Sequence, residues 1–428
     1  MRNYRLGALV FLAAFAGPMG RPSQPPLVRV GLLRGQETIR LQAPAPMRFS
    51  ATYSGKVIAA APAGEVWTIR FAPSRRDLEI VRPDGGVAAA SSRPVVAQAA
   101  DDAPITLFGP SAHWDKRPDR SYRGRLEIRP DRTGGLEAVN VVDVETYLRG
   151  VVPSEMRADF PREALKTQAV AARTATMMFA GRHRSDGFDL CNTEHCQVYG
   201  GATSEGPVAD RAVQETRGQA LTYQGRLAKT YYSAICGGHT ESNHAIWGDD
   251  ELPYLRGVSD LPEDSKYRFP LSEEALGQFL REWPAANCLR PGGYDLRRFR
   301  WWEVWTREGV EKKLAAVGSM GELKDLEVTA RGISGRALAL RATGTAGTLV
   351  LRGDGTLRRV LGVRSSQFVL RLFRDERGAP VAVAIWGGGW GHGVGLCQMG
   401  AVGLARDGWE YGAILQKYYP GTTLRAEY

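Results

Sequence analysis

Short apolar runs, separated by Gly, Pro, Asp and Ser, recur along most of the chain and predict a β-rich protein. Between residues 28 and 140 they include TIRLQA, VWTIRFA, ITLFG and RGRLEI, and similar runs return over residues 325–385. Apolar and β-branched runs of about four to eight residues, bounded by turn residues, are typical of strands.

Residues 160–182 follow a helical rather than a strand period. Pro161 stands where the first turn of a helix tolerates proline, and Gly181 stands near the end of the segment. One stripe at helical spacing contains Leu165, Ala169, Ala172, Thr176 and Phe179. We expect a further helix at 272–283 and helical structure within 397–418. Together the patterns predict a β-rich α+β fold with one central helix and an additional N-terminal β region.

The composition narrows the class of protein. The chain has 428 residues, of which 24% are charged and 43% hydrophobic, which is ordinary for a globular protein and excludes disordered, collagen-like and multispan membrane classes. The formal net charge of +10 has two explanations, a GC-rich genome and an anionic partner. No basic run is interleaved with aromatic residues, so we expect no nucleic acid as partner, whereas an anionic glycan or envelope surface fits.

The first residues predict export. Residues 1–5 carry two Arg, residues 6–17 are an apolar run, and PMGRPSQPP follows. This is the pattern of a secretory signal, although no clear small-x-small cleavage site is present. We therefore expect residues 1–26 to be a signal peptide or an uncleaved N-terminal anchor, and the protein to be exported to the periplasm or cell wall. Disulfides are permitted there.

Glu155 is the first candidate for chemistry. It ends the segment VVPSE, which we interpret as a small-residue turn between a strand-like run and a helix start. A carboxyl group shielded from water there can act as a general acid, because desolvation raises its pKa. The alternative is a helix-entry glutamate favoured by the helix dipole. On the following helix, Lys166 and Arg173 are seven residues apart and share a face. These two residues are candidates for the site, and the alternative is that they form a solvated charged face.

Cysteines and histidines gather in the segment DLCNTEHCQVYGG. Cys191 and Cys196 stand five apart with His195 adjacent and His183 upstream. The spacing leaves two interpretations open, a zinc site and a local disulfide.

A glycine-rich segment, 386–405, contains His392 and Gln398 but lacks the GK[ST] of a phosphate-binding loop. Its glycines allow close backbone approach, and a structural turn is the alternative. The chain has five cysteines, so Cys236, Cys288 and Cys397 leave at least one thiol unpaired if Cys191 and Cys196 act together.

Four blocks of sequence occur together in one order: VDVETYLRGVVPSEM with FPREALKTQAVAARTAT, then CQVYGG, then YYSAICGGHTESN, then GWGHGVGLCQMGAVGLA. Their order and wording resemble the SpoIID/LytB family, which includes the stage II sporulation protein D and the amidase enhancer. The blocks span about 142–425, and VRVGLL near residue 28 resembles the family's opening strand, so the resemblance covers nearly the whole mature chain. We therefore expect the following organisation: an N-terminal β-rich region at 27–140, a catalytic core in two parts at 141–260 and 386–428, and an inserted β-rich subdomain at 261–385.

The resemblance implies a peptidoglycan lytic transglycosylase. Such an enzyme cleaves MurNAc–GlcNAc β-1,4 bonds of glycan strands, in sporulation members strands already stripped of stem peptides, and leaves 1,6-anhydro-MurNAc ends. Glu155 matches the family's catalytic acid, a single carboxyl group that protonates the glycosidic oxygen and then takes the proton of the MurNAc 6-hydroxyl. The resemblance further implies that Lys166 and Arg173 line the same cleft. Substrate-binding candidates are Gln168, Tyr199, His392 and Gln398.

The resemblance also suggests a cofactor and a partner. Some sporulation members bind zinc beside the active site, which points here to His183, Cys191 and Cys196, with His195 as a competing ligand. An N-acetylmuramoyl-L-alanine amidase is the implied partner. The alternative functions are a non-catalytic, wall-binding amidase enhancer and, from another class, a secreted polysaccharide-binding β protein.

Two cysteines depart from the family pattern. Cys236 and Cys397 stand where serine is common in relatives. Our hypothesis is that these two residues meet as a disulfide.

Overall fold

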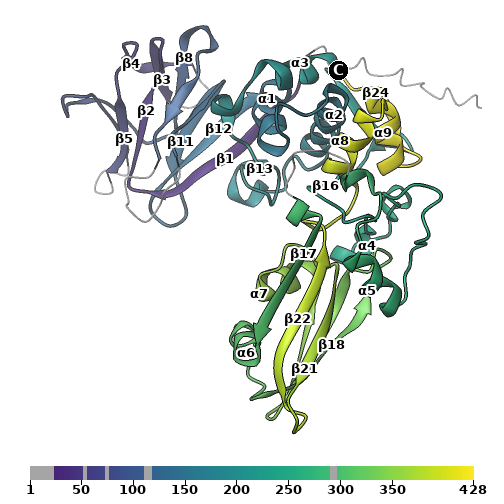
Figure 1. Ribbon diagram of the computed structural model, residues 1–428. Helices are drawn as coiled ribbons and strands as arrows, with labels where there is room; N and C mark the ends of the chain where they lie inside the picture. The colour runs from purple at the N-terminus through teal and green to yellow at the C-terminus, as the bar shows by residue number, and fades with distance from the viewer. Residues whose placement is uncertain (1–23, 52–54, 73–76, 110–117, 290–295) are drawn as a thin grey trace, which may run out of the picture.

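The computed structural model describes residues 24–51, 55–72, 77–109, 118–289 and 296–428. The signal peptide or anchor expected at 1–26 lies almost wholly outside these residues. The described residues combine several sheets with helices and confirm the α+β class. Figure 1 shows β sheets of the N-terminal region on one side, a helical core beside them, and a second β-rich part that projects from the core. None of the helices in the described ranges has the length and apolar character that a membrane crossing needs.

Two sheets pack face to face in the N-terminal region, where Phe49 of one stacks on Trp67 of the other at 5.5 Å between ring centroids. The first sheet has the order β13 (Leu190–Cys191), β1 (Leu27–Gln36), β12 (Leu136–Asp143), β11 (Arg125–Pro130), β8 (Val95–Ala99), β3 (Met47–Ala51), β4 (Val57–Ala61). The second has the order β10 (Arg120–Tyr122), β9 (Ile105–Leu107), β2 (Thr38–Gln42), β5 (Trp67–Ala72), β6 (Asp77–Val81), β7 (Val87–Ser91). The predicted N-terminal β region is confirmed.

The core begins where β12 runs directly into a helix. Its helices are α1 (Val144–Glu155), α2 (Arg162–Met178), α3 (Pro207–Glu215), α4 (Asn243–Trp247), α8 (Gln398–Arg406) and α9 (Tyr411–Tyr418). Its short strands are β14 (Gln219–Tyr223), β15 (Arg226–Leu227) and β24 (Thr423–Ala426) in one sheet, and β16 (Tyr232–Ser233) and β23 (Leu396–Cys397) in another.

Helix α2 is the predicted central helix, and its stripe packs inward: Leu165, Ala169 and Ala172 are fully buried. Nine α-helices occur among the described residues, more than the helical segments that the sequence patterns predicted. The helical structure expected within 397–418 is confirmed as α8 and α9.

The turn expected at VVPSE is also wrong, because α1 continues through it and Glu155 is its last residue. The Asp143 carboxylate accepts a hydrogen bond from the Thr146 backbone amide and caps the helix. Val144, Tyr147, Leu148 and Val151 then recur at helical spacing and are buried. Buried apolar contacts and a capped start outweigh the turn signal of VVPSE, which contains Pro153.

The second β-rich part has a core of its own, which includes Trp301, Leu340, Phe368 and Ile385. Its strands are β17 (Arg300–Thr306), β22 (Pro380–Gly388) and β21 (Phe368–Arg374) in one sheet, and β18 (Leu323–Arg331), β19 (Ala337–Gly344) and β20 (Thr348–Arg352) in another. Its helices are α5 (Glu273–Arg281), α6 (Arg307–Leu314) and α7 (Asp354–Leu361). Helix α5 confirms the prediction at 272–283, while α7 interrupts the region 325–385 that we expected to be strands.

Candidate functional site

A cavity of about 620 Å³ lies where α1, α2 and α8 of the core meet residues 390–392 and helix α7 of the second β-rich part. Glu155 at the end of α1 and Gln398 at the start of α8 both line it. Segments that are far apart in sequence therefore converge on one hollow that contains the candidate acid.

The Glu155 carboxyl group is held from two sides. The backbone amide of Val198 donates to Oε1 at 2.8 Å, and the side-chain amide of Gln398 donates to Oε2 at 3.3 Å. Burial raises the pKa of Glu155 above its ordinary value of 4.5; the two hydrogen bonds lower it in part, and the negative charge of Glu194 raises it further. The net shift is upward, which favours the protonated form that a general acid needs.

Gln168 supports this arrangement from behind. It is fully buried on α2, and its Oε1 accepts a second hydrogen bond from Gln398 Nε2 at 3.3 Å. Gln168 does not line the cavity, so the structure makes it a partner of Gln398 rather than a substrate contact.

His392 lines the cavity as a neutral ring. Its Nδ1 accepts from the Val394 backbone amide at 3.0 Å, so Nε2 carries the hydrogen that bonds to the Tyr232 carbonyl at 3.0 Å. Burial lowers the pKa of His392 to about 4. Because both ring nitrogens take part in hydrogen bonds, the ring is not free to transfer a proton. It forms part of the cavity wall beside Trp247, with 5.1 Å between ring centroids.

Lys166 and Arg173 do not line the cavity, and the expectation that they share the cleft with Glu155 is wrong. Arg173 is fully buried and binds the carboxylate of Glu145 through Nε and Nη2 at 2.9 and 2.8 Å. Lys166 pairs with Glu163 at 2.9 Å. The helical period explains this: Lys166 and Gln168 are two residues apart, about 200° around the helix, so they face opposite sides.

Tyr199 is likewise not a substrate contact. It is 1% exposed, its hydroxyl donates to Asn140 Oδ1 at 2.8 Å, and its ring packs on Tyr147 and Tyr122. In the CQVYGG block, the residue that reaches the site is the neighbouring Val198, whose backbone amide donates to Glu155.

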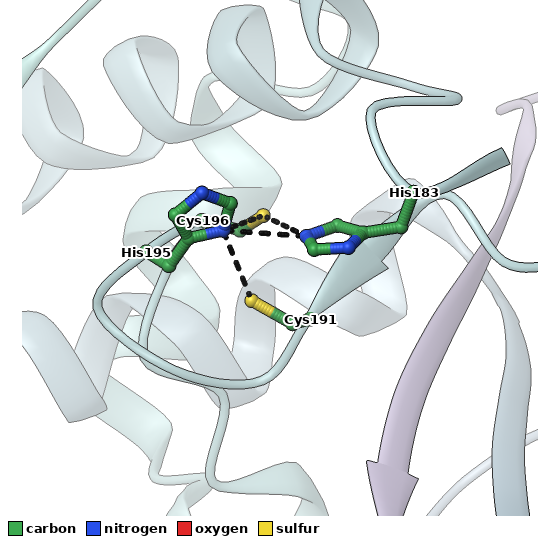
Figure 2. Close-up of side chains that lie close together, drawn as sticks. All are labelled: His183, Cys191, His195 and Cys196. Carbon is green, nitrogen blue, oxygen red and sulfur yellow. Dashed lines mark hydrogen bonds between the residues drawn. The ribbon is translucent and has the colours of Figure 1, made fainter. Parts of the chain in front are cut away.

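His183, Cys191, His195 and Cys196 come together in one cluster, which Figure 2 shows with all four side chains pointing inward. His183 Nε2 and His195 Nδ1 are 3.3 Å apart, and Cys196 Sγ lies 3.4 Å from the first and 3.7 Å from the second. Cys191 Sγ lies 3.6 Å from His195 Nδ1. Both thiols are free, so the geometry fits a four-ligand metal site, in which His195 is a fourth ligand rather than a competitor.

The surroundings of this cluster orient one ligand. Asp186 Oδ2 lies 3.2 Å from His183 Nδ1 and fixes the tautomer that turns Nε2 toward the cluster. The loop from Cys191 to Cys196 continues to Val198, which donates to Glu155. A metal ion here would therefore brace the loop that holds the acid.

The hypothesis of a disulfide between Cys236 and Cys397 is wrong, since all five cysteines are free in the structure. Cys397 Sγ instead accepts a hydrogen bond from the Cys236 backbone amide at 3.2 Å.

Sequence reasoning missed the aromatic and basic groups of the cavity. Trp247 and Trp390 line it with 41% and 39% of their surface exposed, and Tyr231 packs at a tilt against Trp247 with 4.3 Å between ring centroids. Arg182 and Arg358 add positive charge to the wall. Tyr231 lies in the block YYSAICGG and Trp390 in GWGHG. Aromatic residues in these glycine-containing blocks were the signal that could have pointed to the cavity wall. Arg358 lies on α7, outside every block.

The model of the family described as Stage II sporulation protein matches residues 132–223, and that described as Domain of unknown function (DUF8618) matches residues 241–395. An uncharacterized protein of Brachyspira hyodysenteriae is 31% identical over 71% of this chain and 72% of its own length. The Stage II sporulation protein D of Bacillus subtilis is 28% identical over 67% of this chain and 76% of its own. The Amidase enhancer of the same organism is 29% identical over 65% of this chain, a match that spans 40% of that longer protein.

Proposed function

The chain belongs to the SpoIID/LytB family, and we propose that it is a peptidoglycan lytic transglycosylase with Glu155 as its general acid and base. The observation that carries the proposal is the Glu155 carboxyl group, which lies in the wall of a cavity with its pKa raised and with two donors fixed on its oxygens. The relatives' names support a role in the cell wall.

One carboxyl group suffices for the reaction. Protonated Glu155 gives its proton to the glycosidic oxygen as the bond from that oxygen to C1 of MurNAc breaks. The 6-hydroxyl of the same MurNAc then attacks C1, and the Glu155 carboxylate takes the hydroxyl proton. The products are a GlcNAc-ended strand with a free 4-hydroxyl and a 1,6-anhydro-MurNAc end, with no water consumed.

The other cavity residues suit a glycan strand. Trp247 and Trp390 offer exposed aromatic faces on which sugar rings can stack. Arg182 and Arg358 supply positive charge for the lactyl carboxylate of MurNAc. The Arg358 guanidinium is fixed by Asp354, whose Oδ2 accepts from its Nε at 2.8 Å.

We assign zinc to the cluster of His183, Cys191, His195 and Cys196. Zinc bonds of about 2.3 Å to sulfur and 2.0–2.1 Å to nitrogen give tetrahedral edges of about 3.3 Å between nitrogens and about 3.6 Å between nitrogen and sulfur. The measured separations are 3.3 Å and 3.4–3.7 Å. With four protein ligands the ion has no open position, so its role is structural.

The second candidate function is that of an amidase enhancer, favoured by the relative of that name. In this alternative the exported protein binds the wall and stimulates an N-acetylmuramoyl-L-alanine amidase, and Glu155 needs no acid function. Export itself rests on residues 1–26.

The products of digestion distinguish the two functions. The purified chain is incubated with amidase-stripped glycan strands and, separately, with intact wall and an amidase, and the fragments are read by mass spectrometry. Anhydro-ended fragments without amidase support the transglycosylase. Reducing ends would mean hydrolysis, for which Glu194 and Asp249 in the cavity wall are the available carboxylates. If the chain cleaves no strands but the amidase releases peptides faster in its presence than in its absence, the enhancer is favoured.

A further inference from the structure

A second set of potential metal ligands lies buried, with its three cysteines in the main hydrophobic core. It consists of Cys236 after β16, Asp260, Cys288 in the short turn of helix Asn287–Leu289, and Cys397 at the start of α8. We propose that these four residues form a second, structural zinc site with three thiolate ligands and one carboxylate. The site does not depend on the proposed activity.

The geometry provides the first argument. The four ligand atoms lie within 4.8 Å of one another, and none of the residues exposes more than 3% of its surface. Cys236 Sγ and Cys288 Sγ are 3.7 Å apart. Two thiolates at about 2.3 Å from a tetrahedral zinc ion are separated by about 3.8 Å.

Backbone amides point at two of the sulfurs. Cys397 Sγ accepts from the amides of Cys236 at 3.2 Å and Gly400 at 3.4 Å. Cys236 Sγ accepts from the Gly238 amide at 3.4 Å. The turn that allows this has φ angles of 83° at Gly237 and 115° at Gly238, which favour glycine. Amide donors and the positive end of α8 stabilise a thiolate far more than a neutral thiol.

Asp260 is oriented in the same way as a metal-ligating carboxylate. Tyr418 donates its hydroxyl to Oδ1 at 2.6 Å, and the Cys288 backbone amide donates to Oδ2 at 2.9 Å. Such outer partners hold a ligand in place and leave further lone pairs of the carboxylate for the ion.

The charges nearby fit an anionic cluster. Arg300 is 6% exposed, and its guanidinium donates to the carbonyl oxygens of Gly237, Phe279, Phe299 and Glu282. Among the ion pairs of the described ranges, none joins Arg300 to a carboxylate. Three thiolates and one carboxylate bring four negative charges to a divalent ion, so the complex is anionic and Arg300 offsets it.

A disulfide between Cys236 and Cys288 is the other state that this cluster could adopt. It would leave the Cys397 thiol and the Asp260 carboxyl group buried beside it, and it would not use the donors aimed at Cys397. The four-fold arrangement therefore favours a metal ion.

The site would fasten the start of α8. Cys397 is followed by Gln398, which donates to Glu155. A zinc ion that joins Cys397 to Cys236, Cys288 and Asp260 fixes the first turn of α8 and with it the donor to the acid. Because the ligands are buried, we expect the ion to be taken up as the chain folds.

The test is metal stoichiometry. The chain without residues 1–26 is purified after expression with zinc. Its metal content is measured by native mass spectrometry and by elemental analysis. We expect two zinc ions per chain, one ion in the Cys191→Ser/Cys196→Ser variant, and one ion in Cys288→Ser. One zinc ion in the parent chain, lost in Cys191→Ser/Cys196→Ser, would overturn the proposal.

Two further readouts secure the result if Cys288→Ser does not fold. In Cys191→Ser/Cys196→Ser loaded with cobalt, the remaining ion should show the sulfur-to-cobalt charge-transfer band of a thiolate-rich tetrahedral site. Peptide mapping without reduction should recover Cys236 and Cys288 as thiols. A Cys236–Cys288 disulfide in the parent chain, or no charge-transfer band in the variant, would contradict the proposal.

Discussion

Gln398 donates its side-chain amide to the Glu155 carboxyl group at 3.3 Å, although the two residues are 243 positions apart in the chain. The same nitrogen also donates to Gln168 on α2. The candidate acid at the end of α1 thus obtains one of its two hydrogen bonds only when the C-terminal α8 packs beside it. The environment of Glu155 is a property of the folded core as a whole.

The pH dependence of cleavage should respond to Gln398 and Glu194, which shift the pKa of Glu155 in opposite directions. The reaction starts from protonated Glu155, so activity falls as the pH rises through its raised pKa. Gln398→Ala removes a hydrogen bond that stabilises the carboxylate and should move this alkaline limb to higher pH. Glu194→Gln removes a repelling negative charge and should move it to lower pH. Profiles of kcat/KM on defined glycan strands measure both, and limbs that move in the same direction would refute the assignment.

Trp247→Ala should weaken substrate binding and leave the chemical step nearly unchanged. Taking the value of an aromatic pair, about 0.5–1.5 kcal/mol, for one sugar stacked on an aromatic face gives roughly a 2- to 12-fold increase in KM. Trp302→Ala is the matched control, because Trp302 is 69% exposed on β17 and does not line the cavity. If both variants change KM equally, the cavity is not where the strand binds.

Arg173→Met should act on stability rather than on catalysis. It leaves the buried Glu145 carboxylate without its charged partner, a loss of about 3–5 kcal/mol at pH 7. Lys166→Met, which removes a partly exposed pair, should cost less than about 1 kcal/mol. Chemical denaturation measures both, and kcat per folded molecule should be retained in both. A selective loss of kcat in Arg173→Met would restore a catalytic role.

Acid should reduce the difference between the parent chain and Arg173→Met. Burial alone would raise the pKa of Glu145, but the hydrogen bond and charge of Arg173, together with the hydrogen bonds from Tyr428 and Gly218, outweigh it, and the net pKa is below the ordinary value of 4.5. The stability from this pair is therefore fully present above pH 4.5 and is lost as the pH falls through the lowered pKa. An equal difference in unfolding free energy at neutral and strongly acid pH would contradict this account.

His195→Ala should release the zinc that we assign to the cluster of His183, Cys191, His195 and Cys196. It should also loosen the loop that ends at Val198. We expect faster hydrogen exchange at the Val198 amide and a fall in kcat of up to about a hundredfold, because a displaced donor misplaces the acid. His244→Ala is the control, since His244 is exposed and lies outside the cluster. Full activity in a metal-free His195→Ala protein would show that the cluster does not support Glu155.

Much of the strand structure could be predicted from alternation and turn residues, and α2 from its period of 3.6. Helix α1 was missed because the small-residue segment VVPSE signals a turn, whereas the Asp143 cap and four buried apolar residues determine the outcome. Helix α7 was missed because it lies within a region of alternating strands. The prediction therefore failed where local signals compete with tertiary packing.

For the site, the resemblance to a family identified Glu155, Gln398 and His392, which the fold brings to one cavity. It misplaced Lys166 and Arg173, although the helical period places Lys166 about 200° and Arg173 about 140° around α2 from Gln168. The cluster of Cys236, Asp260, Cys288 and Cys397 could not be predicted, because its members come from segments that only the folded core brings together.

The most direct test of the central claim compares the parent chain with Glu155→Gln and Glu194→Gln on amidase-stripped glycan strands, with mass spectrometry of the ends. The account predicts anhydro-MurNAc ends from the parent and from Glu194→Gln, and no cleavage by a folded Glu155→Gln protein. Cleavage by Glu155→Gln at the parental rate would contradict the account, because the carboxyl group to which it assigns both proton transfers would then be dispensable.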